Sequence, residues 1–360
     1  MKKTPFYEMH KKYGAKIVEF AGFEMPVQYE GIIAEHKKVR NSVGVFDVTH
    51  MGEIEISGSG ALDFIQKITT NDASKLEEGK IQYSAMCYKD GGIVDDLLVY
   101  HCGSYYMLVV NASNKDKDFN WMMENKSGDV EIKDKSDEFS LLAIQGPDSL
   151  KTIQKLTDAD LQGIKYYHFV KGKVAGVDAI ISRTGYTGEL GFELYFKSDI
   201  EISEKIWMAI FEAGKEFGIA PIGLGARDTL RLEMGMCLYG NDIDQTTHPL
   251  EAGLGWITKF DKGEFNAKDV LLKAKNEGLK RRLVGFTIED KAFPRHNYEI
   301  FSGDKKIGYV TSGTFSPVLN YSIGMGYVEK EFSNEGTVID IMIRNKPVKA
   351  KVTKPPFVKK

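Results

Sequence analysis

Two adjacent acids, Asp95 and Asp96, open a strand-like run that two glycines introduce, in the segment Gly91–Tyr100 (GGIVDDLLVY). Side chains of an extended chain alternate between two faces, so Asp96 should share a face with Leu98 and Tyr100. A carboxylate beside an aromatic ring in a half-closed pocket could handle protons or stabilise a cation. In the alternative interpretation both acids lie at an exposed strand start and cap neighbouring amides.

A second segment, Ser182–Phe196 (SRTGYTGELGFELYF), has three glycines spaced by three residues between two strand-like runs. The glycines permit a tight turn with Tyr186 at its tip. In the second strand, alternation puts Phe192 and Phe196 on the core face and Glu193 on the opposite face. Glu193 either faces a ligand or is a solvated residue of an ordinary hairpin. The spacing is not that of a dinucleotide fingerprint.

A third segment, Pro221–Glu233 (PIGLGARDTLRLE), is a glycine-rich lead into a helix. Arg227 and Arg231 stand at i and i+4, where like charges are unfavourable unless an anion lies nearby. Helix starts attract anions, and an arginine can bind a carboxylate through two parallel hydrogen bonds. The expected anion is either the acid tail of a ligand or one of the protein's own acids, Asp228 or Glu233.

Other candidate residues carry weaker signals. His50 beside Met51 could be functional, although a lone histidine is more often structural. The aromatic run at 166–169 (YYHF) could stack on a planar ring or belong to the core. The seven histidines and three cysteines show no metal-binding spacing, so no metal site is expected.

The elements that must position these residues follow from periodicity and turn signals. Helices are predicted at 31–41, 59–68, 148–156 and 199–217, the last ending at Gly218. Strands are predicted at 53–57, 105–111 and 140–146, and the polar stretch 126–138 is read as a solvated hairpin or a boundary. Past Lys280, six short strand-like runs broken by Gly, Asn, Asp and Pro predict a small β-barrel. The fold class is therefore α+β.

Composition restricts the class of protein. Hydrophobic residues make up 42% of the 360-residue chain and charged residues 28%, and the net charge is only -3. No long apolar run reaches the length of a membrane span, and no field of one sign would attract nucleic acid or an anionic membrane. The three cysteines form no disulfide pattern, and the first twenty residues do not have the character of a signal or transit peptide. A cytoplasmic location is expected.

Taken in order, these segments resemble the glycine cleavage T-protein family from end to end. The resemblance is carried by KTPFYEMHKKYGAKIVEFAGFEMPVQY, SVGVFDVTHMGE, GGIVDDLLVY, SRTGYTGELGFEL, GLGARDTLRLEMGMCLYGNDID, PLEAGLGWITK and GYVTSGTFSPVLNYSIGMGYV. It implies three domains in a cloverleaf around a central channel that binds tetrahydrofolate. We expect residues 1–52 and roughly 139–280 to form interleaved α+β domains that carry most of the folate site. Residues 53–138 should form the α+β domain that carries Asp96, and residues 281–360 should form the barrel.

The resemblance also implies roles for single residues. The family's aspartate at the position of Asp96 lies against the reactive nitrogens of the folate and is the expected catalytic residue. The residue matching Arg227 holds the glutamate tail, and the acid matching Glu193 recognises the polar edge of the pterin. The remaining residues expected to line the folate site are Met51, Tyr83, Tyr100, Asn111, Tyr167 and Tyr186.

The activity that the resemblance implies is transfer of a methylene carbon from the aminomethyl-dihydrolipoyl arm of H-protein to tetrahydrofolate, with release of ammonia. A carboxylate at Asp96 would stabilise the developing positive charge. Two alternatives have the same fold: a non-catalytic folate-binding protein, and the folate-dependent subunit of a dimethylglycine or sarcosine oxidising enzyme. The first is marked by a KGCYxGQE motif, whereas this chain reads LYGND at 238–242.

Overall fold

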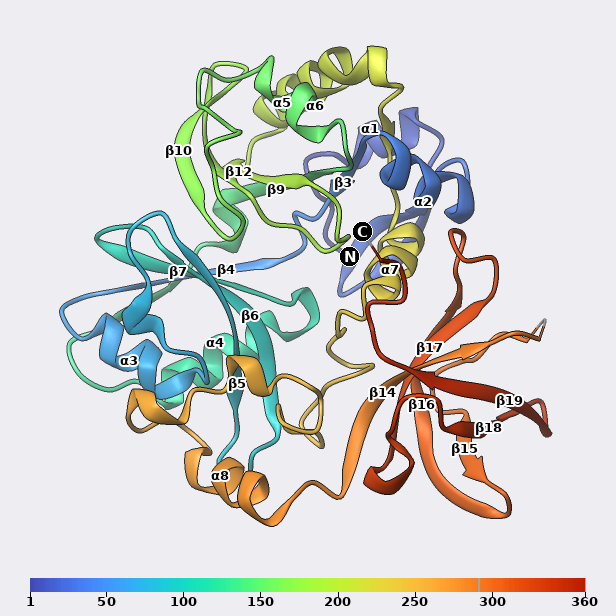
Figure 1. The fold of residues 1–360 in the computed structure, drawn as a ribbon. Helices are drawn as coiled ribbons and strands as arrows, with labels where there is room; N and C mark the ends of the chain where they lie inside the picture. The colour runs from blue at the N-terminus through green and yellow to red at the C-terminus, as the bar shows by residue number, and fades with distance from the viewer. Residues whose placement is uncertain (291, 360) are drawn as a thin grey trace. The chain divides into compact units, whose positions relative to one another are not determined.

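The computed structural model describes residues 1–290 and 292–359. The chain forms two compact units (Figure 1). The first unit holds residues 1–64, 73–83 and 97–228, and the second holds residues 65–72, 84–96 and 229–360. No helix of the described part of the chain has the length and apolar character needed to cross a membrane.

A six-stranded sheet forms the centre of the first unit, in the order β10-β11-β12-β9-β3-β13. The helices of this unit are α1 (Tyr7–Lys12), α2 (Ile32–Asn41), α4 (Lys115–Glu124), α5 (Ser149–Gln154), α6 (Ile200–Gly214) and the start of α7 (Leu224–Glu233), and a hairpin joins β1 (Lys16–Phe20) to β2 (Phe23–Gln28). The six strands are β10 (Phe169–Val174), β11 (Val177–Ser182), β12 (Gly191–Lys197), β9 (Phe139–Gln145), β3 (Gly44–Asp47) and β13 (Ala220–Pro221).

The core of this unit lies between one face of the sheet and helix α6. The apolar residues Ile206 and Ile210 recur at helical spacing in α6 and pack with Trp207 against the side chains of β11 and β12. Asp199 caps the helix by accepting the backbone N–H of Ile202 at 3.0 Å. The chain leaves the helical region at Gly218, which has the left-handed φ of 62° that favours glycine.

A second sheet has the strand order β5-β6-β7-β4-β8. Its strands are β5 (Ile81–Cys87), β6 (Ile93–His101), β7 (Tyr105–Val110), β4 (Gly52–Ser57) and β8 (Glu131–Asp134), and α3 (Ala61–Ile68) follows β4 in the chain. Strands β5 and β6 and helix α3 run from one unit into the other, so Asp96 belongs to the second unit while Tyr100, in the same strand, belongs to the first.

The second unit contains α8 (Lys268–Glu277) and a closed barrel, in the order β14-β17-β16-β15-β18-β19. The barrel strands are β14 (Arg281–Ile288), β15 (Glu299–Ser302), β16 (Lys305–Phe315), β17 (Ser322–Glu329), β18 (Val338–Ile343) and β19 (Lys346–Thr353). Neighbouring backbones approach so closely that a Cβ built at Gly308 would lie 1.8 Å from the carbonyl oxygen of Tyr327. Glycine is therefore required at that position.

The structure confirms the predicted α+β class and the predicted barrel, whose six strands coincide with the six sequence runs. Helices at 31–41, 59–68, 148–156 and 199–217 were each predicted to within a few residues, as were the strands at 53–57, 105–111 and 140–146. The polar stretch 126–138 contains the short strand β8 rather than a separate hairpin. The three-domain division and the central channel stay predictions.

Candidate active site

Glu193 lies on the face of β12 opposite the core, as alternation predicts. Phe192, Leu194 and Phe196 are buried in the core cluster, whereas Glu193 is partly exposed. Strands β11 and β12 pair with Ser182 directly opposite Glu193. The carboxylate accepts a short hydrogen bond from the hydroxyl of Thr184, in the loop that follows β11.

The groups around Glu193 shift the pKa of its carboxyl group in opposite directions. Removal from water raises the pKa of its carboxyl group, while the Thr184 hydrogen bond and the positive charge of Arg227 lower it, and the net direction is upward. Glu193 in turn contributes to the raised pKa of Tyr167, for which desolvation is the largest cause. Glu193 therefore interacts electrostatically with both Arg227 and Tyr167 within the first unit.

Arg227 lies in the first turns of α7, with its guanidinium carbon 4.7 Å from the centre of the Tyr186 ring. This cation–π contact holds the side chain in one orientation. Arg227 forms no ion pair with any carboxylate in the described part of the chain. Gly223, directly before α7, donates its N–H to Glu35 at 2.7 Å, so a protein acid occupies that donor at the helix start.

Arg231, one turn later in α7, binds to groups of the protein itself. It is fully buried, and its guanidinium lies 2.6 Å from a carboxylate oxygen of Asp242 and donates to Ser312 at 2.8 Å. The acid Glu233 accepts a hydrogen bond from Ser316. The two arginines that the sequence presented as equivalent are thus different: Arg231 completes a buried ion pair, and Arg227 is available to an external anion.

The two acids of β6 also differ. Asp95 is fully buried, which contradicts the interpretation that both acids lie at an exposed strand start. Asp96 is partly exposed, on the face that alternation predicts. Its charge contributes to the raised pKa of the Cys237 thiol, after desolvation and Asp242, so it lies near Cys237 in the second unit. A Cβ at Gly92 would lie 2.0 Å from the carbonyl oxygen of Gln245, which explains the second glycine before the strand.

The turn between β3 and β4 carries His50 and Met51. Asp47 shapes this turn by accepting the N–H of Thr49 at 3.0 Å, and its other oxygen lies 2.9 Å from the ring of the buried His10. His50 is buried edge-on against Phe20, and Nδ1 has no hydrogen-bond partner among the described residues. Burial and the charge of Arg227 lower the pKa of His50 to about 3, so its ring is neutral at pH 7.

The other predicted site residues lie in the first unit with different degrees of burial. Met51, Tyr83 and Asn111 are partly exposed. Tyr167 is partly exposed and packs edge-on against Tyr166 at 4.6 Å, which supports a role as an aromatic wall. Tyr100 has no exposed surface, so it can support the site but does not present its ring to a ligand in this conformation.

Sequence reasoning missed Glu53, which follows the β3–β4 turn. The side chain is buried, and among the described residues neither carboxyl oxygen has a hydrogen-bond partner. Burial raises its pKa well above the ordinary range, and the nearby charges of Asp134 and Glu193 add to that direction. The neutral form of Glu53 is therefore favoured in the folded protein. Alternation along the strand predicted at 53–57 puts Glu53 and Glu55 on the same face, but it does not show which of them is covered.

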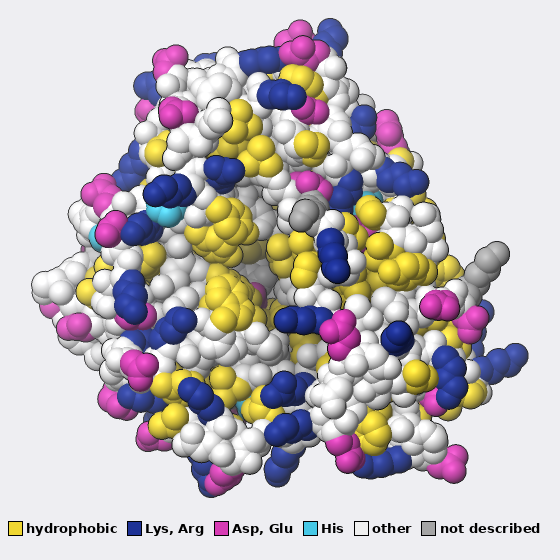
Figure 2. All heavy atoms as spheres, viewed as in Figure 1, with side chains coloured by type: hydrophobic (Ala, Val, Ile, Leu, Met, Phe, Trp, Pro, Cys, Tyr) yellow, Lys and Arg dark blue, Asp and Glu magenta, His cyan; other side chains and the backbone are white. Residues whose placement is uncertain are grey.

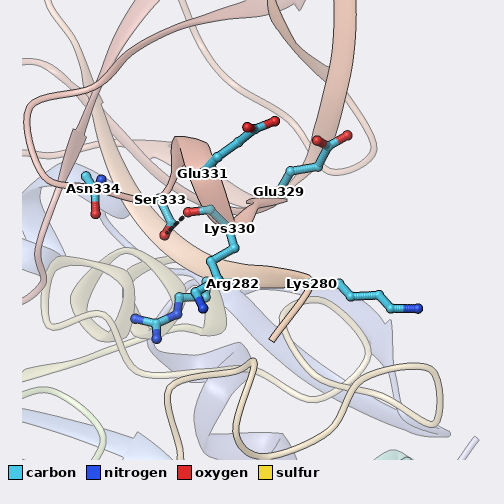
Figure 3. Close-up of a pocket in the computed structure, with 7 residues that line it drawn as sticks. All are labelled: Lys280, Arg282, Glu329, Lys330, Glu331, Ser333 and Asn334. Carbon is cyan, nitrogen blue, oxygen red and sulfur yellow. Dashed lines mark hydrogen bonds between the residues drawn. The ribbon is translucent and has the colours of Figure 1, made fainter. Parts of the chain in front are cut away.

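A separate cavity of about 610 Å³ lies at the end of the barrel (Figure 3). The residues that line it are all polar or charged: Lys280, Arg282, Glu329, Lys330, Glu331, Ser333 and Asn334. Glu329 and Glu331 point away from Arg282 and form ion pairs with Lys305, at 2.5 and 3.1 Å. The three cations of the lining form no ion pair with another described residue. Without an aromatic wall the cavity does not suit a planar ring, but its charge suits an anion.

On the face shown in Figure 2, acidic and basic side chains are interspersed rather than separated into large fields. This distribution agrees with the net charge of -3. The basic lining of the barrel cavity is therefore a local feature and not part of a general positive surface.

The first unit thus gathers a half-buried carboxylate, an arginine that has no carboxylate partner in the described chain, and tyrosine rings near both. Such a set suits a planar molecule that has hydrogen-bond donors on one edge and an acid at its tail. The sequence motifs resemble those of folate-dependent transferases, and the arrangement of these residues agrees with that class.

The comparisons with known proteins agree with this class. The model of the GCVT N-terminal domain matches residues 6–262, and that of the glycine cleavage T-protein C-terminal barrel domain matches residues 281–359. The chain is 53% identical to an aminomethyltransferase of Halothermothrix orenii over 359 residues, covering 99% of this chain and 100% of the relative. It is 56% identical to an aminomethyltransferase of Bacteroides fragilis over 363 residues, covering both chains completely.

A solved structure, the glycine cleavage system aminomethyltransferase T of Bartonella henselae, aligns with a TM-score of 0.92 at 32% identity, over 99% of this chain and 98% of that one. The chain belongs to the glycine cleavage T-protein family of aminomethyltransferases.

Proposed function

We propose that this protein transfers the methylene carbon of an aminomethyl group, carried on the dihydrolipoyl arm of the glycine cleavage H-protein, to tetrahydrofolate. The products are methylenetetrahydrofolate, ammonia and dihydrolipoyl H-protein. One observation carries the proposal: a chain matched along its whole length by aminomethyltransferases contains, in one unit, a carboxylate and an arginine beside aromatic rings, and this arginine has no carboxylate partner among the described residues. The full-length match does not favour the non-catalytic or the sarcosine-oxidising alternative.

The residues of the first unit suit the two ends of tetrahydrofolate. One oxygen of Glu193 is occupied by Thr184, and an ionised carboxylate can still accept N–H groups from a pterin edge. Tyr167 and Tyr186 offer ring faces for a planar ligand. Arg227, oriented by Tyr186, is proposed to bind the glutamate tail, and Met51, Tyr83 and Asn111 to complete the walls.

Asp96 is the proposed catalytic residue. Tetrahydrofolate supplies the nucleophilic nitrogen, and positive charge develops on the transferred carbon as ammonia leaves. A fixed carboxylate stabilises that charge and orients the reacting groups, and both effects lower the barrier without proton abstraction. The partial exposure of Asp96, in contrast with the buried Asp95, is compatible with contact between this side chain and substrate.

The H-protein is the proposed partner, since carriers of lipoyl groups are typically acidic. Lys280, Arg282 and Lys330 form the basic patch that we assign to its docking, because the acids beside them are already paired with Lys305. Charge complementarity of this type steers association and fixes orientation. The reaction is proposed to take place in the cytoplasm, in keeping with the bacterial relatives.

The test is ammonia release by the purified protein from aminomethylated H-protein, measured with and without tetrahydrofolate. Release that depends on both components, with formation of methylenetetrahydrofolate in equal amount, supports the proposal. Binding of tetrahydrofolate without turnover would instead identify a folate-binding protein.

A further inference from the structure

The face of β11 and β12 that carries Glu193 is polar, yet most of it is buried. Ser182 and Tyr195 lie on this face with essentially no exposed surface, and Thr184 is also buried. A buried hydroxyl group without a partner is costly, so the partners of these groups are informative.

The hydroxyl groups are connected in a single chain that ends at Glu193. The Tyr195 hydroxyl lies 2.9 Å from that of Tyr100, which lies 3.0 Å from Oγ of Ser182. Ser182 Oγ lies 2.8 Å from Oγ1 of Thr184, and Thr184 donates to Oε2 of Glu193. All five residues belong to the first unit.

The number of protons fixes the direction of this chain. Each of the four hydroxyl groups has one proton to donate, and the chain contains four hydrogen bonds. An ionised Glu193 only accepts, so Thr184 donates to Glu193, Ser182 to Thr184, Tyr100 to Ser182 and Tyr195 to Tyr100. Desolvation raises the pKa of both tyrosines, so they keep their protons at pH 7. With Glu193 as the final acceptor, each of the four protons makes one hydrogen bond.

We propose that Tyr195, Tyr100, Ser182 and Thr184 form a one-directional hydroxyl chain that favours the ionised form of Glu193 against the effect of its burial and orients it as an acceptor for the N–H edge of the pterin. They are positioning residues, since they act on the ligand through Glu193. Hydrogen bonds in such a buried chain polarise one another, so the terminal bond to the carboxylate is strengthened by those behind it. The burial of Tyr100, which the sequence placed in the wall of the site, is then explained by its place in the middle of the chain.

This inference rests on the proposed function, because it takes Glu193 to be the pterin-recognising acid. It adds that selectivity for a ligand edge rich in N–H donors depends on residues that touch no ligand. A neutral Glu193 could also donate, and it would discriminate less strictly against a ligand edge that presents acceptors.

The experiment compares isosteric variants for tetrahydrofolate affinity, for KM and for kcat with aminomethylated H-protein. Thr184→Val removes the terminal donor with little change of shape, and binding should weaken about 10-fold, in KM and dissociation constant alike, with kcat changed less than about 3-fold. Tyr100→Phe breaks the chain two bonds earlier and should weaken binding about 3-fold. Thr184→Ser restores the hydroxyl and should return affinity to within about 2-fold of wild type.

Ser203→Ala is the matched control. Ser203 and Ser140 form a buried hydroxyl pair 3.0 Å apart next to the same sheet, and the pair has no hydrogen bond to Glu193. This variant should lose stability without losing folate affinity. Equal tetrahydrofolate affinities of Thr184→Val and Ser203→Ala, or failure of Thr184→Ser to restore affinity, would refute the hydroxyl chain. The proposed folate site would still stand in that case if wild-type protein binds tetrahydrofolate and Glu193→Gln does not. If wild-type protein itself binds no tetrahydrofolate, the proposed function fails first.

Discussion

Arginines 227 and 231 stand one turn apart on α7 and have opposite predicted roles, so their replacement by methionine tests the site directly. Methionine keeps an unbranched apolar stem and removes only the guanidinium. The structure predicts that Arg227→Met affects substrate affinity and that Arg231→Met affects stability.

The magnitudes follow from the contacts of each guanidinium. Arg227 contacts Tyr186 and has no carboxylate partner in the described chain, so its loss removes a cation–π contact of about 1 kcal/mol from the folded protein. A charge-assisted bond to the folate tail is worth about 1.5–3 kcal/mol, so KM for tetrahydrofolate should rise about 10- to 160-fold. Since the tail is bound alike in ground and transition states, kcat should change little.

Arg231→Met leaves Asp242 buried without its cationic partner, although Thr311 still donates to that carboxylate. Breaking a buried ion pair on one side costs about 3–5 kcal/mol. The unfolding temperature should therefore fall clearly, while KM for tetrahydrofolate stays close to wild type at temperatures where the variant remains folded.

The assay is steady-state ammonia release at saturating aminomethylated H-protein with tetrahydrofolate varied, together with thermal unfolding of each variant. The reasoning is refuted if Arg227→Met retains the wild-type KM, or if it loses as much stability as Arg231→Met. Either result would mean that Arg227 serves the fold rather than the ligand.

Asp96→Asn should slow transfer about 100- to 10,000-fold at saturating tetrahydrofolate, the range for a positioned catalytic group, with a much smaller loss of folate affinity. Asp95→Asn, at the buried neighbour, should instead lower the unfolding temperature, and a larger loss of turnover in that variant would contradict the assignment. KM for H-protein should rise with ionic strength, and the double change Lys280→Glu, Lys330→Glu should raise it further and remove most of the salt dependence. A salt-independent wild-type KM would exclude electrostatic docking at the barrel cavity. Because burial raises the pKa of Glu53 in the folded protein, the stability that its neutral form provides is present below the ordinary value of 4.5 and is lost as pH rises toward the folded pKa. Glu53→Gln should therefore match wild type in unfolding temperature near pH 4 and exceed it increasingly toward pH 8, and a difference independent of pH would refute the raised pKa of Glu53.

The local sequence determined most of the secondary structure. Helix α6 was predictable because its apolar residues recur at helical spacing between an Asp cap and a terminal glycine. The barrel strands were predictable because short β-branched and aromatic runs alternate with turn residues. The hairpin β1–β2 was not predicted, since its strands are only partly buried and their alternation is weak.

The candidate site was predictable residue by residue only where alternation applies. Glu193 was correctly placed opposite the core of β12, and Asp96 was correctly separated from Asp95. The burial of Asp95 and Tyr100 could not be read from β6, because periodicity shows which residues share a face but not what covers that face.

The sequence by itself determined the family, the order of the elements and the face on which each acid lies, because these depend on neighbours a few residues apart. Only the tertiary structure decided that Arg231 pairs with Asp242 while Arg227 pairs with no described carboxylate. It also decided that four hydroxyl groups from three strands and a loop form a chain that ends at Glu193. Those contacts join residues up to 95 positions apart in the sequence. Whether a polar side chain is satisfied by the protein or left for a ligand is fixed by packing between elements, which no local pattern records.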